Sequence, residues 1–318
     1  MPTLLISYTL PEPSTRSLAK HFTLIHPTER QSFSREEILK HIVDVDAYLA
    51  VNTEVDRAVI DQARNLKIIA NYGAGYDDID TEYAAARGIV VTNTPTAVTE
   101  ATAEIAFGLM LSLLRNITFC DRQLRTNQDF AWGMLKAHTG RSLYGKTLGI
   151  IGLGRIGKAV ARRAIVSGMN VIYHQRHPAF SGIEKEVSAT YYTLHDLLAQ
   201  ADIVSIHIPL TDATHHLIDT EELSRMKPSA FLINTARGSV VNQAALIKHL
   251  QEGKIAGAGL DVFAEEPQVP NEFLSMDRVV LTPHIGTETI EARTAMADEA
   301  ERNLVAFFNG DRPPNVVN

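Results

Sequence analysis

The sequence predicts an α/β fold built as two domains, each with a parallel sheet. Short apolar runs alternate with helical patterns almost from end to end, which is typical of parallel strands joined by crossover helices. A length of 318 residues allows about two domains with sizeable cores. A hydrophobic content of 45% and a charged content of 21% are ordinary for a globular protein.

The first series of expected strands comprises five short segments, at residues 3–8, 23–27, 47–51, 67–73 and 89–93. Helical patterns at residues 35–42 and 56–64 lie between them. This series contains no glycine fingerprint for nucleotides. It therefore predicts an α/β domain that binds no dinucleotide of its own.

The second series of expected strands follows a long apolar helix at residues 101–114. Its strands are expected at residues 146–152, 170–174, 202–208, 230–235, 255–262 and 278–283, and a last helix is expected from about residue 288. Two strand series separated by a long helix indicate a chain that crosses twice between domains. We expect the crossings near residues 95–100 and 286–289.

Charge and cysteine content exclude several classes of protein. The net charge of -7 and the pI near 5.9 argue against binding to nucleic acid or to an anionic membrane surface. A lone Cys120 excludes an internal disulfide framework and fits a reducing compartment. The apolar start lacks the features of a signal peptide, and the helix at 101–114 is shorter than the about 20 residues of a membrane span. We therefore expect a cytoplasmic protein.

The stretch "GLGRIG" at residues 152–157 predicts a dinucleotide site. Gly152 would end a strand, Gly154 would leave room for a pyrophosphate, and Gly157 would let the next helix pack on the strand. The helix N-terminus, with Arg155 and Ile156, would receive the phosphates. An ordinary glycine turn is the alternative, but the strand before the motif and the helix after it favour a dinucleotide.

The residues after the second strand of this series bear on the choice of coenzyme. An NAD enzyme usually carries an acid there, whereas the 2'-phosphate of NADP requires a cation. This chain has Gln175, Arg176 and His177. Because no carboxylate would repel a phosphate, we favour NADPH over NADH. The alternative is a solvated Arg176, with NADH accepted through other contacts.

Three later strands each end near a charged or titratable side chain. Arg237 follows one strand, Asp261 with Glu265 and Glu266 follows the next, and His284 follows the last. Ligands of open parallel sheets bind at this end of the strands. Each residue alone could be a surface ion pair, a solvated acid or a satisfied histidine. Combined with the glycine fingerprint, they indicate a catalytic site.

The motifs "GLGRIG", "NTARGSVV", "GLDVFAEEP" and "LTPHIG", in this order and spacing, strongly resemble the D-isomer-specific 2-hydroxyacid dehydrogenases. The stretch beginning "NYGAGYDDID" resembles the same family, so the resemblance covers nearly the whole chain. It implies a catalytic trio in which Arg237 binds a 2-keto acid and polarises its carbonyl. His284 would donate a proton, and Glu266 would raise the pKa of that imidazole.

The resemblance also implies further contacts. Asp261 would bond the nicotinamide carboxamide, and Pro209 and Thr235 would complete the coenzyme site. Backbone N–H groups of Ala74 and Gly75 would bind the substrate carboxylate, as glycines permit a close approach. A plain strand-to-helix turn is the alternative for that loop.

The domain layout implied by the family is a substrate domain from both chain ends and a Rossmann coenzyme domain inserted between them. We place the first at residues 1–98 plus 288–318 and the second at 99–287. Substrate would sit in the cleft between them. The long helix from about residue 101 typically packs across a twofold axis in the family, which implies a homodimer.

The resemblance is greatest to the glyoxylate/hydroxypyruvate or 2-ketogluconate reductase branch of the family, so the leading functions are the reductions of glyoxylate and hydroxypyruvate with NADPH or NADH. The acid at position 266 argues against formate dehydrogenase, and the lack of a regulatory domain after residue 318 disfavours the longer phosphoglycerate dehydrogenases. Glu288 departs from the family by placing a charge near the hinge. Alternatives are oxidation of another small anion such as phosphite, and a dinucleotide-sensing corepressor.

No metal is expected, since the pairs His174 with His177 and His215 with His216 lack a third ligand. Tyr72, Trp132, Leu135 and Leu210 are candidates for shaping the pocket.

Overall fold

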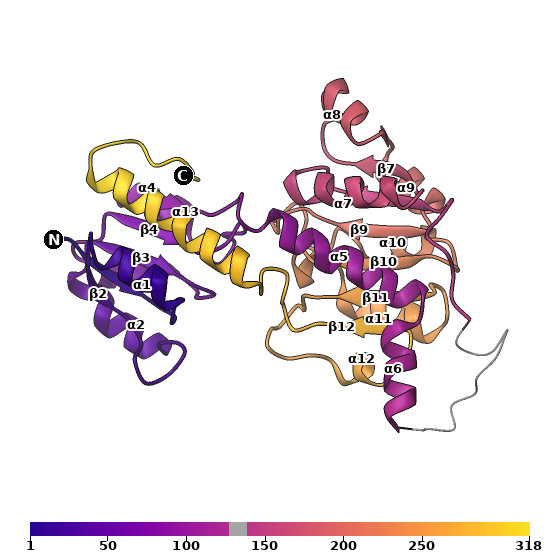
Figure 1. The fold of residues 1–318 in the computed structure, drawn as a ribbon, viewed down its shortest axis with the longest axis horizontal. Helices are drawn as coiled ribbons and strands as arrows, with labels where there is room; N and C mark the ends of the chain where they lie inside the picture. Colours follow the sequence, from indigo (N-terminus) through magenta and orange to yellow (C-terminus); the bar gives the residue numbers. More distant parts are fainter. Residues whose placement is uncertain (127–138) are drawn as a thin grey trace. The chain divides into compact units, whose positions relative to one another are not determined.

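The computed structural model describes residues 1–126 and 139–318, which form two compact units (Figure 1). The first unit comprises Met1–Val98 with Thr287–Asn318, and the second comprises Thr99–Gly286. The second crossing, between Gly286 and Thr287, lies one residue earlier than expected from the sequence. The expected α/β class with two parallel sheets is confirmed.

The first unit contains a five-stranded parallel sheet in the order β2-β1-β3-β4-β5. Its strands are β1 (Thr3–Ile6), β2 (Thr23–Ile25), β3 (Ala47–Ala50), β4 (Ile68–Asn71) and β5 (Val90–Thr92). Its helices are α1 (Glu12–Leu18), α2 (Arg35–His41), α3 (Arg57–Gln62), α4 (Thr81–Ala86) and α13 (Ile290–Phe308). This is the flavodoxin-like strand order. Helix α13 begins two residues later than expected, because the side chain of Thr289 caps the N–H of Ala292.

The C-terminal segment, residues 315–318, lies along β5. Val316 forms an antiparallel bridge with Thr92, and the N–H of Val317 donates to the carbonyl of Val91 at 2.9 Å. The side chain of Asn318 accepts from the N–H of Val91 and donates to the carbonyl of Ile89. The segment therefore pairs in the antiparallel direction with β5, the edge strand of an otherwise parallel sheet.

The second unit contains a seven-stranded parallel sheet in the order β12-β11-β10-β9-β6-β7-β8. The strands are β6 (Thr147–Ile151), β7 (Asn170–His174), β8 (Ala189–Tyr191), β9 (Ile203–Ile206), β10 (Phe231–Asn234), β11 (Gly257–Leu260) and β12 (Val279–Leu281). The chain enters at β6, moves to one side through β7 and β8, and returns to the other side from β9 onward. This doubly wound order extends that of the Rossmann fold.

The helices of the second unit follow or connect these strands. They are α5 (Thr99–Leu114), α6 (Ile117–Thr126), α7 (Arg155–Val166), α8 (Ser181–Glu186), α9 (Leu194–Gln200), α10 (Thr220–Arg225), α11 (Gln243–Gln251) and α12 (Asn271–Leu274). Two hydrophobic clusters fill the sheet's two faces; one includes Leu109, Val160 and Ile233, and the other includes Leu198, Leu232 and Leu246. Since every strand is parallel, all carboxyl ends meet at one edge.

Helix α5 is largely buried and contacts α7, β10 and β11. Within the described residues, no single helix has the length and apolar character needed to cross a membrane. Helices α5 and α6 reach that level only as a pair, and the chain bends by 62° between them.

Candidate active site

The glycine loop follows β6 at the carboxyl edge of the second sheet, and two of its glycines are required by packing. Gly152 has φ +96°, and a Cβ there would lie 2.6 Å from the carbonyl oxygen of His207. A Cβ on Gly157 would lie 2.1 Å from the carbonyl oxygen of Gly152. A Cβ on Gly154, in contrast, would meet no described atom within 4 Å. The loop is therefore tight at both ends and open at its middle glycine.

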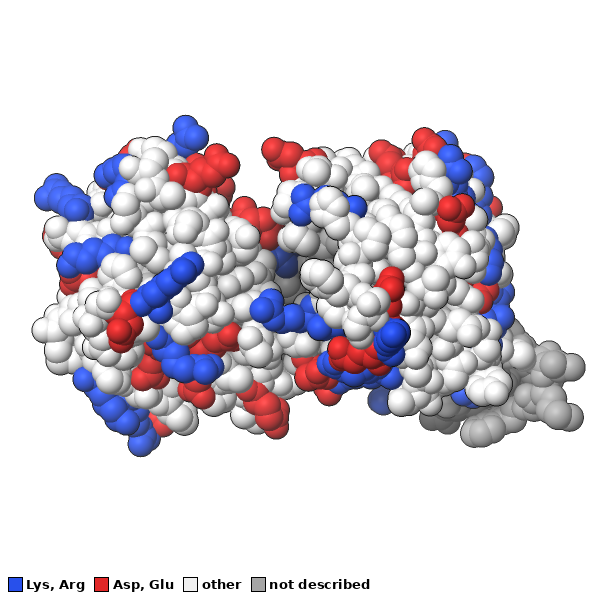
Figure 2. Space-filling view, turned by 90° about the horizontal axis from the view of Figure 1, so that it is seen from above, with Lys and Arg blue, Asp and Glu red and all other residues white. Residues whose placement is uncertain are grey.

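Helix α7 starts directly after this open glycine and presents uncapped donors. Gly154 is the N-cap residue and offers no side-chain oxygen to the first turn. The N–H groups of Arg155, Ile156 and Gly157 and the helix dipole therefore favour an anion at this point. Arg155 is exposed beside them. Elsewhere on the molecule, Lys and Arg side chains are intermingled with Asp and Glu on the face in Figure 2, so an anion depends on such local donors.

The segment after β7 is organised by Gln175. Its Oε1 accepts from the N–H of Leu153 at 3.2 Å, and its Nε2 donates to the carbonyl of His177 at 2.8 Å. Gln175 therefore ties the glycine loop to the end of β7, a role that the sequence analysis did not foresee. Arg176 is exposed and forms no ion pair with any described residue.

Two further expected coenzyme residues lie at the same edge. Thr235 follows β10 and is 8% exposed, and its buried hydroxyl has no hydrogen-bond partner in the described part of the chain. A buried hydroxyl without a partner is uncommon and fits a site completed by a bound polar group. Pro209 follows β9 and is exposed, and its carbonyl accepts from the hydroxyl of Thr214 at 2.7 Å. The open glycine and the Thr235 hydroxyl both fit a bound dinucleotide.

The three expected catalytic side chains follow three adjacent strands. Arg237 follows β10, Glu266 lies in the loop after β11, and His284 follows β12. Nδ1 of His284 lies 2.7 Å from Oε2 of Glu266. The other carboxylate oxygen of Glu266 accepts from the N–H of Phe263 at 3.0 Å. This leaves Nε2 of His284 as the ring nitrogen available to a ligand.

Charge couples these three residues. The hydrogen bond that the His284 ring donates to Glu266 raises the pKa of His284 above its ordinary value of 6.5, against burial and the charge of Arg237. Burial works to raise the pKa of Glu266, but the hydrogen bonds from His284 and Phe263 and the nearby positive charges outweigh it, so this pKa is lowered. The pair therefore favours an imidazolium beside a carboxylate, with a guanidinium close enough to act on both.

Asp261 builds the turn that carries His284. Its carboxylate, in a residue that is 1% exposed, accepts from the hydroxyl of Thr282 and from the N–H groups of Ile285 and Gly286, at 2.6, 2.8 and 2.9 Å. His284 itself has φ +53°, an uncommon conformation for a non-glycine residue. Burial raises the pKa of Asp261, against these hydrogen bonds. The carboxamide contact expected for Asp261 stays a prediction beside this structural role.

Gly238 and Asn234 set the position of Arg237. A Cβ on Gly238 would lie 2.0 Å from the carbonyl carbon of Phe263, so only glycine lets the two loops touch. Asn234, 1% exposed at the end of β10, donates to the carbonyl of Arg237 and accepts from the N–H of Ala236. Asn234 was not among the residues expected from the sequence; an amide that ends the apolar run "FLIN", four residues before Gly238, is the signal that could have found it.

Ala74 and Gly75, expected to bind the substrate carboxylate, belong to the first unit and lie in the loop after β4. The structure thus brings Arg237, Glu266 and His284 together in one unit with the glycine loop, and holds Ala74 and Gly75 in the other. Tyr72, which precedes the loop, is 4% exposed, and its hydroxyl donates to the carbonyl of Arg293.

The remaining candidates are placed as follows. Glu288 pairs with Arg293 in the first unit, and Leu210 packs against a core of the second. Trp132 and Leu135 lie outside the described residues. The rings of His215 and His216 stack with centroids 3.9 Å apart. In the described ranges, no three His, Cys, Asp or Glu side chains form a group that could hold a metal ion.

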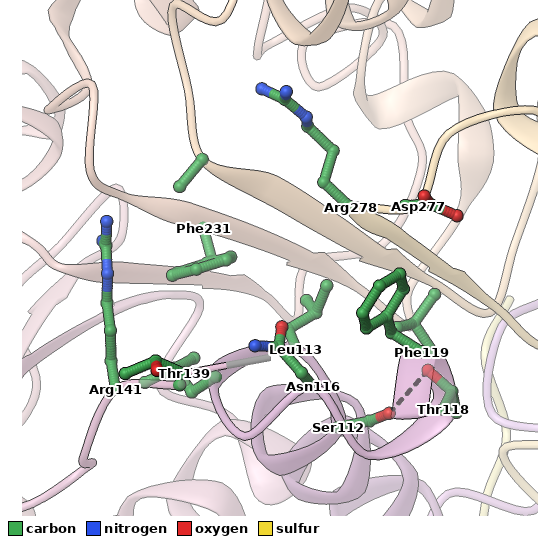
Figure 3. Close-up of a pocket in the computed structure, with 14 residues that line it drawn as sticks. Ser112, Leu113, Asn116, Thr118, Phe119, Thr139, Arg141, Phe231, Asp277 and Arg278 are labelled. Carbon is green, nitrogen blue, oxygen red and sulfur yellow. Dashed lines mark hydrogen bonds between the residues drawn. The ribbon is translucent and has the colours of Figure 1, made fainter. Parts of the chain in front are cut away.

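A cavity of about 190 Å³ is shown in Figure 3, and none of these residues lines it. Phe231, the first residue of β10, and Ala256, directly before β11, are among its lining residues. The cavity is thus at the amino ends of the strands, whereas the glycine loop and the trio follow the carboxyl ends. It is not part of the candidate active site.

A doubly wound sheet with this glycine loop and a coupled imidazole and carboxylate defines an α/β oxidoreductase that uses a dinucleotide. The family model "D-isomer specific 2-hydroxyacid dehydrogenase, NAD binding domain" matches residues 107–286. The chain belongs to the D-isomer-specific 2-hydroxyacid dehydrogenase family, which confirms the resemblance seen in the sequence. Its cofactor is a nicotinamide dinucleotide.

Named relatives match along the whole chain. A glyoxylate reductase from Pyrococcus furiosus is 46% identical over 322 residues, covering 100% of this chain and 95% of the relative. A crystal structure of an NADPH-dependent glyoxylate/hydroxypyruvate reductase from Sinorhizobium meliloti, in complex with NADP and malonate, is 35% identical with a TM-score of 0.87, covering 99% of this chain and 96% of that one. A glyoxylate reductase structure from Paecilomyes thermophila is 35% identical with a TM-score of 0.89, covering 100% and 99%.

Proposed function

We propose that this protein reduces small 2-keto acids, glyoxylate and hydroxypyruvate foremost, to D-2-hydroxy acids. The observation that carries the proposal is the 2.7 Å contact between His284 Nδ1 and Glu266 Oε2 beside Arg237. The names of the relatives support the substrate class, since glyoxylate reductases match the chain over its full length.

Each catalytic side chain has one task in this proposal. The guanidinium of Arg237 binds the substrate carboxylate and polarises the adjacent carbonyl. When bound, the reduced nicotinamide supplies the hydride that forms the new C–H bond at the carbonyl carbon. Nε2 of His284 gives its proton to the carbonyl oxygen, which becomes the hydroxyl. Glu266 holds Nδ1–H of the ring, fixes its orientation and favours its charged form before the transfer.

The proposal extends to the coenzyme contacts. The N–H groups at the start of α7 and the open Gly154 would hold the pyrophosphate, and Thr235 and Asp261 would contact the nicotinamide portion. We favour NADPH, because the residues after β7 include the exposed Arg176 and no acid. The NADP bound to the Sinorhizobium relative is consistent with this choice.

Further contacts complete the proposal. Ala74 and Gly75 would donate backbone N–H groups to the substrate carboxylate. Helix α5 would pack across a twofold axis in a homodimer, and the protein would work in the cytoplasm.

The test is a panel of 2-keto acids assayed with NADPH and NADH, and phosphite assayed with NADP+ and NAD+, using the wild-type protein and His284→Ala. We expect saturable oxidation of NADPH by glyoxylate or hydroxypyruvate, and a loss of about 10²–10⁴-fold in kcat for the variant with coenzyme affinity unchanged. His195→Ala, which changes an exposed histidine on α9, is the control. Turnover of phosphite alone, or coenzyme binding with no turnover of any acid, would replace this proposal with one of the two alternatives.

A further inference from the structure

We propose that Asn71 and Asn93 are positioning residues that orient the loop Gly73–Gly75 for binding a carboxylate, and that Glu299 and Asn303 hold Asn93 in place. All of these residues belong to the first unit. The inference rests on the proposed function, which assigns Ala74 and Gly75 to the substrate carboxylate.

Side-chain amides donate hydrogen bonds to all three consecutive carbonyl groups of the loop, those of residues 73–75. Nδ2 of Asn71 donates to the carbonyls of Gly73 and Gly75 at 3.1 and 2.7 Å. Nδ2 of Asn93 donates to the carbonyl of Ala74 at 2.8 Å. Two amides from the ends of two neighbouring strands, β4 and β5, therefore converge on one short turn.

This bonding determines where the N–H groups of the loop point. In a planar trans peptide, each C=O points opposite to the N–H of the next residue. When the carbonyls of residues 73–75 face the two amides, the N–H groups of Ala74, Gly75 and Tyr76 face away from them. No described residue accepts a hydrogen bond from any of these three N–H groups. Successive outward N–H groups of this kind form a nest for an anion.

Both backbone polar groups of Asn93, its N–H and its C=O, are hydrogen-bonded. It is 7% exposed, and its N–H donates to the carbonyl of Asn315 at 3.1 Å. Its carbonyl accepts from Nδ2 of Asn303 at 3.0 Å, and Oδ1 of Asn303 accepts from the N–H of Asn315 at 3.2 Å. Asn303 is fully buried in α13. The side chain of Asn93 thus points at the loop from a backbone that cannot shift alone.

Glu299, one turn earlier on α13, fixes the segment that follows Asn93. It is 5% exposed, and its Oε2 accepts from the N–H groups of Thr96 and Ala97 at 3.3 and 3.1 Å. Its Oε1 accepts from the side chain of Asn315 at 3.1 Å. A buried carboxylate is costly unless its oxygens are bonded. Here every donor comes from the crossover segment or the C-terminal segment, so Glu299 joins both to α13.

The test compares Asn93→Asp with Asn318→Asp. The first variant keeps the shape of the side chain and removes the donor to Ala74. The second removes a similar amide donor, to the carbonyl of Ile89 at 2.9 Å, from the same sheet but away from the loop. We expect Asn93→Asp to raise the KM for glyoxylate about tenfold, the effect of one lost hydrogen bond, with kcat changed much less. Coenzyme affinity and the KM of Asn318→Asp should match the wild type.

A binding experiment makes the test independent of turnover. Calorimetric titration of oxalate into the protein saturated with oxidised coenzyme should show a Kd about tenfold weaker for Asn93→Asp. Asn71→Asp removes both hydrogen bonds that the other strand donates to the loop, so it should weaken the binding of oxalate in the same way. It replaces Asn93→Asp in the test if that variant does not fold. Glu299→Gln should shift KM in the same direction by a smaller factor.

The outcomes separate this inference from the proposed function. Unchanged KM and unchanged oxalate affinity in both Asn93→Asp and Asn71→Asp would overturn the inference while leaving a working reductase. An equal rise of KM in Asn318→Asp would also overturn it, because loosening of the whole sheet would then be the cause. Oxalate binding that weakens as expected in a protein that reduces no keto acid would support the inference and refute the proposed function.

Discussion

The backbone N–H of His284 donates to the backbone carbonyl of Asp261 at 2.8 Å, and the Asp261 carboxylate takes up the next two N–H groups. These bonds hold His284 at a positive φ of 53°. A non-glycine residue keeps a left-handed backbone conformation only where the surrounding structure fixes it. The bonds to Asp261 do so here, and they thereby fix the direction of the His284 side chain toward Glu266. The buried acid thus acts on the imidazole through the main chain.

Replacing Asp261 should therefore affect both stability and activity. Asp261→Asn turns one acceptor oxygen into a donor, which leaves at least one N–H or hydroxyl of the turn without its partner. We expect the free energy of unfolding to fall by about 1–3 kcal/mol, and kcat to fall with it. Denaturant titration and steady-state assays measure the two effects. Asp277→Asn, at an exposed carboxylate, should change neither; a normal kcat in Asp261→Asn would argue against the positioning of His284 by this turn.

The pH dependence of reduction should follow the imidazole. Glu266 raises the pKa of His284, so the protonated donor persists above the ordinary value of 6.5 and is lost as pH rises through the raised value. The pH profile of kcat/KM for reduction should therefore fall on its alkaline side. In Glu266→Gln this alkaline limb should move to lower pH, because the neutral amide cannot favour the imidazolium. Rate profiles of both proteins test this, and identical limbs would remove Glu266 from the assignment.

Coenzyme selection should depend on Arg176. Arg176→Ala removes the exposed cation after β7, so kcat/KM with NADPH should fall about tenfold while the value with NADH changes little. Initial rates at varied concentrations of each coenzyme give both values. Arg16→Ala, an exposed arginine in the first unit, is the control. Equal losses with both coenzymes would assign Arg176 to the shared part of the dinucleotide.

The packing of Gly238 allows a matched pair of variants. Gly238→Ala would place a methyl group 2.0 Å from the backbone of Phe263, so the Arg237 loop must move and activity should fall sharply. Gly182→Ala, in helix α8, meets open space and should be neutral or stabilising by up to about 1 kcal/mol. Melting temperatures and kcat for both variants decide the matter. A fully active Gly238→Ala would show that the loop position is not critical.

Much of the fold could be predicted from the sequence, because buried parallel strands appear as short apolar runs between helices. Strand β8 was missed: only Ala189 of its three residues is buried, so the segment shows no run and no alternation. The expected strands also extended too far at their carboxyl ends. His207 and Asp261 are followed by apolar Ile208 and Val262, which lengthen the runs in the sequence, but all four residues lie in the loops after β9 and β11.

The candidate site divides in the same way. Arg237, the acids after β11 and His284 could be expected at one edge because each follows a strand, and parallel strands bring their carboxyl ends together. The choice of Glu266 among those acids came from the family resemblance. The roles of Gln175 and Asn93 could not, because an amide side chain gives no sign in sequence of which distant backbone group it meets. Asn303 bonds the carbonyl of Asn93 across 210 residues of chain. Such long-range polar contacts depend on tertiary packing alone.

The strand-like segment 315–318 has one more consequence. An uncovered sheet edge is a template for pairing with another polypeptide, and β5 would be such an edge. The segment runs antiparallel to β5: the carbonyl of Asn315 accepts from the N–H of Asn93, and the N–H of Val317 donates to the carbonyl of Val91. The side chain of Asn318 bonds the N–H of Val91 and the carbonyl of Ile89. The first unit is thereby protected against self-association by strand addition along β5, and variants that release this segment should aggregate before they unfold.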